Sequence, residues 1–85
     1  SHCAGDINIQ MEEIKVQQGS VIDGKTIQES SIGSKYGVII VAIKDRSGKM
    51  NFNPRHNTLI QSGDTLIILC EKEKFSLLTK LAVGS

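Results

Sequence analysis

Two segments of this 85-residue chain carry apolar side chains on both faces of a predicted strand. The first, KYGVIIVAIKD at 35–45, sends alternate side chains to opposite faces of a sheet. One face would receive Val38, Ile40 and Ala42, and the other would receive Ile39, Val41 and Ile43. The second segment, TLIILC at 65–70, has the same property. Strands of this kind need a cover on each side of the sheet.

The first third of the chain predicts one strand and one short helix. Apolar alternation over about 8–17 changes phase at Glu12-Glu13, which predicts either a bulge there or a disordered start. Further along, Ile27 and Ser30 lie at helical spacing, and Gly33 follows them. This spacing predicts a helix of two turns that ends at Gly33.

The rest of the chain predicts a hairpin, a turn and a terminal helix. Ser47-Gly48 suits a tight turn that joins the strand at 38–44 to a strand ended by Pro54. A second turn at 61–64, in which Gly63-Asp64 makes the reversal, separates the apolar segments TLI at 58–60 and TLIILC at 65–70. Near the C-terminus, apolar residues at three- and four-residue intervals predict an amphipathic helix: Phe75, Leu78, Leu81 and Ala82. The predicted fold class is α+β, with a small, mostly antiparallel sheet of four to five strands and two helices.

The composition is that of one small domain, with 39% hydrophobic, 22% charged and 4% aromatic residues. We assign 11–85 to the domain and 1–10 to a tail or linker remnant. Because the chain starts at Ser1 without an initiator Met, we expect it to be a fragment of a longer protein. A domain of this size buries only roughly 60–65% of its extended-chain surface. Two helices then cover one face of the sheet, and a second copy of the chain is the simplest cover for the other. The pattern therefore predicts a homodimer.

Charge and cysteine content point to no chemical partner. Lys and Arg are spread along a chain of net charge +1, which argues against binding to nucleic acid or to an anionic membrane surface. Cys3 and Cys70 lack the spacing of a disulfide scaffold or a zinc site, which favours a reducing, cytosolic setting. No apolar run approaches the roughly 18 residues that cross a bilayer, so we expect no direct membrane insertion of this segment.

The residue spacing predicts no catalytic, cofactor or metal site. Ser, His and Asp occur without the spacing of a nucleophile on a strained turn. His2-Cys3 offers too few ligands for a structural metal, and the scattered acids are interpreted as a solvated face. We interpret His56 beside Arg55 as a solvated loop pair and Cys70 as a buried apolar side chain. A small nucleic-acid-binding barrel stays open as an alternative, although the chain has only one Tyr and two Phe for stacking.

Five short motifs follow one another between residues 14 and 81. They are Gly19-Ser20 after the first strand, Gly24-Lys25-Thr26-Ile27, Tyr36-Gly37 before the second strand, Asn53-Pro54, and Gly63-Asp64 before TLIIL. A chain with these motifs in this order resembles the TrkA-C domain, the C-terminal lobe of the RCK regulators of potassium channels and transporters, which also occurs in other bacterial transporters. The resemblance implies the sheet with two helices described above, and dimerisation through this lobe.

The resemblance further implies a cytosolic regulatory domain of a cation channel or transporter, with potassium as the expected ion, and not an enzyme. In this family a ligand bound to the cytosolic part shifts the population between closed and open arrangements. The implied partners are a second copy, a Rossmann-like lobe, and a membrane pore or carrier of the same or an associated protein. This chain lacks the G-x-G-x-x-G fingerprint of that lobe. A transporter of another kind, such as an anion or dicarboxylate permease or an antiporter, stays open as an alternative.

Some members of the family bind cyclic di-AMP in the dimer cleft. The resemblance places the apolar wall of a ligand-binding cleft at Ile32, Ile39 and Pro54. The loop pair Arg55 and His56, which could bind an anion, completes the candidate ligand site. The doubly apolar strand predicts a dimer interface at Ile39, Val41 and Ile43. Resembling members have an acid, an Arg and an Asn where this chain has Ser31, Gly33 and Ile39. Side chains of Gly and Ile donate no hydrogen bond to a phosphate or an adenine, which argues against cyclic di-AMP as the ligand here.

Overall fold

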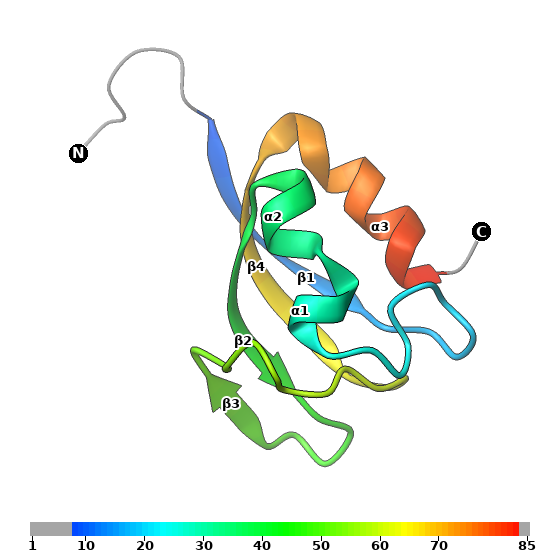
Figure 1. Cartoon of the computed structure of the whole chain (residues 1–85). Helices are drawn as coiled ribbons and strands as arrows, with labels where there is room; N and C mark the ends of the chain where they lie inside the picture. Colours follow the sequence, from blue (N-terminus) through cyan, green and yellow to red (C-terminus); the bar gives the residue numbers. More distant parts are fainter. Residues whose placement is uncertain (1–7, 84–85) are drawn as a thin grey trace.

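The computed structural model describes residues 8–83 as one antiparallel sheet with helices packed on one of its faces (Figure 1). The strands are β1 (Ile9–Lys15), β2 (Ile39–Lys44), β3 (Met50–Phe52) and β4 (Thr65–Glu71), in the order β1-β4-β2-β3. The helices are α1 (Ile27–Ser30), α2 (Ile32–Tyr36), the 3₁₀ turn η1 (Lys72–Lys74) and α3 (Phe75–Val83). The predicted α+β plan is confirmed. The sheet is open, with β1 and β3 at its edges, so the alternative of a closed barrel is wrong.

β4 is the centre of the sheet, although it is the last strand of the described chain. It pairs with β1 on one side and with β2 on the other. Its Leu66, Ile68 and Cys70 are buried beneath the helices, whereas Ile67 and Leu69 are half-buried on the opposite face. The prediction of a central strand that is apolar on both faces is therefore confirmed.

A β-bulge at Val41 changes which side chains of β2 face the helices. Ile40 and Ala42 pair with two adjacent residues of β4, so Val41 between them is the extra residue. The prediction that side chains alternate strictly between the two faces of the sheet is therefore wrong after the bulge. Ile43 enters the hydrophobic core with 5% of its surface exposed, and Ala42 lies on the face away from the helices.

β1 pairs with β4 in a continuous register, so the bulge predicted at Glu12-Glu13 is wrong. The apolar phase changes because the two halves of the strand supply different faces of the sheet. Ile9 and Met11 lie on the face without helices, whereas Ile14 is buried in the core. β1 also begins before residue 11, the predicted start of the domain.

The segment predicted as one helix forms two, because Ser31 adopts a left-handed conformation with φ 58° and separates α1 from α2. The predicted end at Gly33 is therefore wrong. α1 begins with a capping box: the Thr26 hydroxyl accepts a hydrogen bond from the Glu29 N–H, and the Glu29 carboxylate accepts one from the Thr26 N–H. α2 ends at Gly37, whose φ of 67° lies in the region that glycine adopts most easily.

The C-terminal segment forms the predicted amphipathic helix. Leu78 and Ala82 of α3 are buried, while Phe75 and Leu81 pack against the margin of the core. The Gln17 N–H donates to the Ala82 carbonyl at 2.8 Å, which ties the end of α3 to the segment after β1. The core therefore lies between the sheet and its helices, on one side only.

Two turns at one end of the sheet are joined by Arg46. Its Nε donates to the Ser62 carbonyl and its guanidinium NH2 donates to the Ser62 hydroxyl, both at 3.0 Å. Gly63 permits this approach, because a Cβ at that position would collide with the Arg46 side chain. The predicted hairpin turn between β2 and β3 is confirmed, with Gly48 at φ 90°.

Candidate interaction surface

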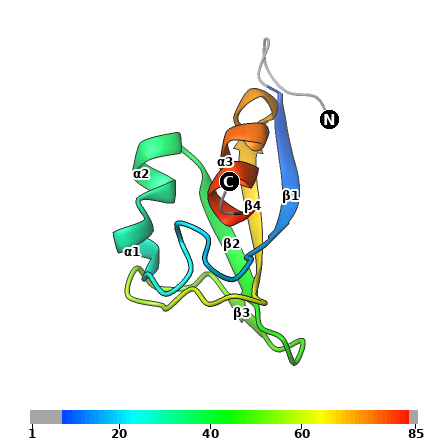
Figure 2. The same ribbon diagram turned by 90° about the vertical axis from the view of Figure 1, so that its right-hand side faces the viewer.

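The face of the sheet away from the helices carries a continuous set of apolar side chains. Figure 2 shows α1 and α2 on one side of the strands. On the other side, one small and seven large apolar residues follow the rungs of the sheet. We call this set the open face: Ile9, Met11, Ile39, Ala42, Met50, Phe52, Ile67 and Leu69.

Several side chains of the open face are mostly exposed. The exposed fraction is 73% for Phe52, 63% for Ile39 and 61% for Met11. Complete burial of a side chain of this size is worth about 1.5–3 kcal/mol. A partner that covered all three would therefore gain several kcal/mol, and contiguous apolar patches of this kind mark interaction sites on soluble domains.

The three residues predicted for a dimer interface occupy three different environments. Ile39 is exposed on the open face, Val41 is half-buried at the bulge, and Ile43 is buried in the chain's own core. Ile43 therefore cannot line a contact on the open face, because the bulge reverses the phase of the strand before it. The prediction missed Phe52 and Leu69 on this face. The two-sided pattern of 65–70 already contained a signal for Leu69, whereas Phe52 carries no comparable signal in a strand of three residues.

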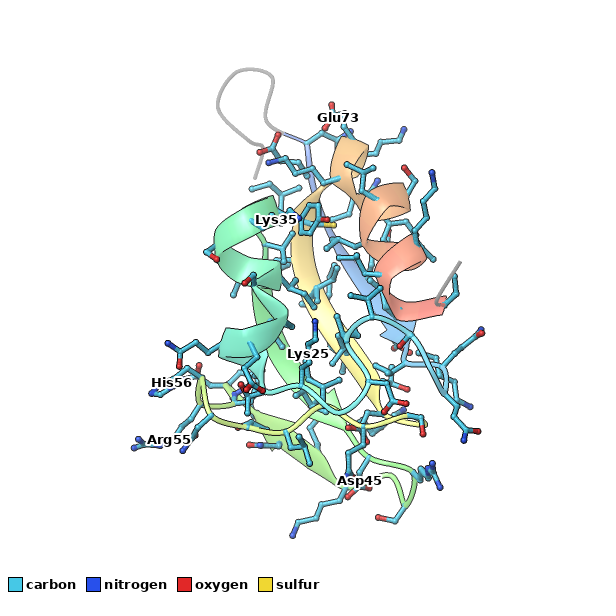
Figure 3. All side chains as sticks on the ribbon, turned by 45° about the vertical axis from the view of Figure 1, so that its right-hand side comes forward. Lys25, Lys35, Asp45, Arg55, His56 and Glu73 are labelled. Atoms are coloured by element: carbon cyan, nitrogen blue, oxygen red, sulfur yellow. The ribbon has the colours of Figure 1, made fainter. Side chains whose placement is uncertain are left out.

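The residues predicted for a ligand cleft do not form one site within the chain. Ile32 is buried in the core with 3% exposed, and Ile39 lies on the open face. Arg55 and His56 are exposed in the loop after β3, beside α1 (Figure 3). Pro54, in the same loop, is half-buried.

The loop that carries His56 is held against α1 by its backbone. The Gln28 N–H donates to the His56 carbonyl at 2.9 Å, and the Ile27 N–H donates to the Thr58 carbonyl at 3.0 Å. A hollow of about 290 Å³ lies here, lined by Ile27, Gln28, Ser31, Gly33, Ser34 and His56. The fold thus brings His56 beside Ser31 and Gly33, and Ile39 does not line this hollow.

Three aspartates, Asp23, Asp45 and Asp64, accept hydrogen bonds from backbone N–H groups. Asp23 accepts from the N–H groups of Gly19 and Ser62, and Asp64 accepts from that of Gln61. The Ser47 hydroxyl and the Lys49 N–H bind the Asp45 carboxylate, and these bonds lower the pKa of Asp45. Among residues 8–83, no three His, Cys, Asp or Glu side chains gather in a way that would hold a metal ion.

Cys70 is a free thiol buried in the core, as predicted, and this desolvation raises its pKa. A raised pKa keeps the sulfur protonated and unreactive. The other cysteine, in the pair His2-Cys3, lies outside the residues that the structure describes.

A model of the TrkA-C domain family matches residues 11–83, which include the whole of the sheet except the first two residues of β1. This chain belongs to the TrkA-C family. Within the described range, none of the helices of this TrkA-C domain is long and apolar enough to cross a bilayer.

Two proteins of Bacillus subtilis strain 168 are related to this TrkA-C domain in sequence. The uncharacterized protein YrvC is 33% identical over 58 residues, which cover 68% of this chain and 35% of YrvC. The K⁺/H⁺ antiporter subunit KhtT is 29% identical over 63 residues, which cover 74% of this chain and 38% of KhtT. The chain thus spans little more than a third of the length of these relatives.

Solved structures with the same fold include C-terminal RCK domains. The RCK C domain of the potassium transport protein KtrA, solved with cyclic di-AMP, has a TM-score of 0.75 and 26% identity, covering 85% of this chain and 81% of that one. The RCK_C domain dimer of Streptococcus agalactiae BusR, also with cyclic di-AMP, has a TM-score of 0.75 and 26% identity, with 91% of each chain covered. The GsuK RCK domain has a TM-score of 0.75 and 28% identity over 88% of this chain, but only 16% of the GsuK chain.

Proposed function

We propose that this TrkA-C domain is the regulatory and dimerisation module of a prokaryotic potassium transport system and works on the cytosolic side of the membrane. The family match supports this role, as do the likenesses to the RCK C domain of KtrA and to the antiporter subunit KhtT. The observation that carries the dimerisation part is the open face, because it leaves Ile39 and Phe52 largely in water. A second copy would cover this face, and a related RCK_C domain was solved as a dimer.

In this proposal the domain transmits a ligand signal to a pore or carrier through a Rossmann-like lobe of the same or an associated protein. A ligand can act in this way only by binding one arrangement of the dimer more tightly than another. Ile39, Pro54, Arg55 and His56 can contact such a ligand, whereas Ile32 is enclosed in the core. Because Ile39 offers no hydrogen bond to an adenine, we propose a ligand other than cyclic di-AMP.

The part of the protein that receives the signal can differ between members of this fold. BusR from S. agalactiae, 27% identical over 84% of this chain, was solved in complex with its busAB-promoter DNA, and this chain covers 34% of that BusR chain. The second candidate function is therefore the regulation of a transporter for another ion, or of a process other than transport, such as one that involves promoter DNA.

Two substitutions on adjacent residues test the dimerisation part. Ile39 points to the open face, and Ile40 packs against the core. Ile39→Asp should leave a folded monomer, because the new charge stays in water in the monomer and would be buried in the dimer. Ile40→Asp should instead lower the free energy of unfolding by at least about 3 kcal/mol, because it places a charge against the core.

Sedimentation at micromolar concentration and circular dichroism distinguish these outcomes. An unmodified domain that stays monomeric at high concentration would contradict the dimerisation part of the proposal. The regulatory part is tested in the full-length protein, where Ile39→Asp should change the response of potassium flux to the cell's ligands. An unchanged response would contradict it.

A further inference from the structure

The open face has opposite charges at its two ends. Lys15 on β1 and Lys44 on β2 both lie opposite Thr65, so two lysines flank the first residue of β4. Glu71, the last residue of β4, lies on the same face at the other end. With a rise of about 3.3 Å per residue, the carboxylate end is about 20 Å from the lysine end. The two lysines are about 10 Å apart, which is two strand spacings.

The middle of the open face is apolar and consists of two rungs. One rung joins Met11, Leu69 and Ile39 across β1, β4 and β2, and the next joins Ile67, Ala42 and Phe52 across β4, β2 and β3. Ala42 is only 2% exposed, so it forms the floor between larger neighbours. Glu13 continues the second rung beside Ile67, but it sits on edge strand β1, where its side chain is exposed at the rim of the face.

Two copies that cover each other's open faces can stack with their β4 strands parallel or antiparallel. In the parallel arrangement, Lys44 of one copy approaches Lys15 of the other, because β2 then lies over β1, and Glu71 approaches Glu71. The antiparallel arrangement places Glu71 of each copy between Lys15 and Lys44 of the other. Like charges across an interface are strongly unfavourable, whereas opposite charges fix its orientation.

We therefore infer that the dimer is a face-to-face sandwich with antiparallel β4 strands, in which Glu71 of each copy lies between Lys15 and Lys44 of its partner. This arrangement also places the two apolar rungs of one copy over those of the other, so that Leu69 lies over Ile67. Packing of aligned sheets about 10 Å apart is an ordinary arrangement for two apolar sheet faces. The inference rests on the dimerisation proposed above and adds its orientation.

A charge exchange tests the orientation. Lys44→Glu and Glu71→Lys should each weaken the dimer about tenfold, because each puts like charges together at two symmetric places. The double variant should return to within about threefold of the unmodified affinity, and these differences should shrink at 1 M salt. Lys80→Glu, on the exposed side of α3, is the matched control with the same change in net charge and should leave the affinity unchanged.

Cross-linking distinguishes the two stackings directly. Lys44→Cys and Glu71→Cys chains, each in a Cys3→Ser background and with different tags, should form mainly the mixed disulfide when they are combined and oxidised. A Glu71→Cys chain that links to itself more readily than to Lys44→Cys would overturn the inference, because parallel β4 strands bring the two Glu71 positions together. A double charge variant weaker than both single variants would also overturn it. Either result would leave the dimer itself intact. A monomeric unmodified domain would instead remove the proposed dimer before any variant is compared.

Discussion

At the scale of single residues, Ser31 is an unexpected feature of this domain. It adopts the left-handed conformation, and its side chain forms no capping hydrogen bond to α2. An L-residue in this region costs roughly 1–2 kcal/mol, and Asn tolerates it better than Ser does. The other left-handed residue of the described chain that is not glycine is Asn53, which is of the tolerant kind.

Ser31→Gly should therefore raise the free energy of unfolding by about 0.5–1 kcal/mol. Glycine removes the steric cost of the left-handed conformation but makes the unfolded chain more flexible, so the net gain is smaller than the full strain. Ser34→Gly is the matched control, because Ser34 lies in α2 with an exposed side chain and should lose about 0.5–1 kcal/mol. Urea denaturation measures both, and equal effects would contradict the assignment of strain to Ser31.

At the scale of elements, α1 depends on its capping box. A helix of four residues is far too short to be stable alone in water. The reciprocal hydrogen bonds between Thr26 and Glu29 satisfy two N–H groups at its start. The pattern Thr-x-x-Glu at 26–29 was visible in the sequence, so a search for capping boxes would have predicted the helix start.

The charge of Glu29 should contribute to the pH dependence of stability. The hydrogen bonds from the Thr26 backbone and side chain lower the pKa of Glu29 below its ordinary value of 4.5. A lowered pKa stabilises the fold fully above pH 4.5 and loses this effect as the pH falls through the folded-state pKa. Glu29→Gln keeps the hydrogen-bonding oxygen without the titration, so its unfolding free energy should fall less between pH 6 and pH 3. A fall equal to that of the unmodified domain would contradict this account.

Thr26→Ala tests the other half of the capping box. It removes the hydroxyl that accepts from the Glu29 N–H, and it should lower the free energy of unfolding by about 1 kcal/mol at pH 7.

The strands show a different limit of sequence reasoning. Periodicity predicted β1, β2 and β4, and the Ser47-Gly48 turn predicted β3, but periodicity could not tell a bulge from a change of face. The bulge lies at Val41 in β2, while β1 keeps its register and changes its apolar side, because pairing with β4 decides both.

At the scale of the whole molecule, the open face is the feature that the sequence predicted best. Two-sided strands in a short chain implied an uncovered apolar face, and Ile39 lies on it. The position of Phe52 and the charged ends of the face could not be predicted. They depend on which strands are neighbours, and the order β1-β4-β2-β3 is a long-range property that local patterns do not contain.

If a second copy covers the open face, folding and association are linked. The unfolding midpoint of the unmodified domain should then rise with protein concentration, because mass action favours the dimer over the unfolded monomer. The midpoint of Ile39→Asp should stay constant over the same range, since this variant should be monomeric. Thermal unfolding followed at several concentrations between about 1 and 100 μM measures both. A midpoint that is independent of concentration in the unmodified domain would contradict the linkage.

The central position of β4 also has a consequence for how the chain is made. β1 and β2 both pair with β4, yet β4 is the last of the four strands to leave the ribosome. Lys15 can therefore pair with Thr65 only after all the residues between them have been synthesised, which takes several seconds at roughly 5–20 residues per second. During this interval the strands already made have no central partner, so the nascent chain exposes apolar segments to chaperones until β4 has left the ribosome.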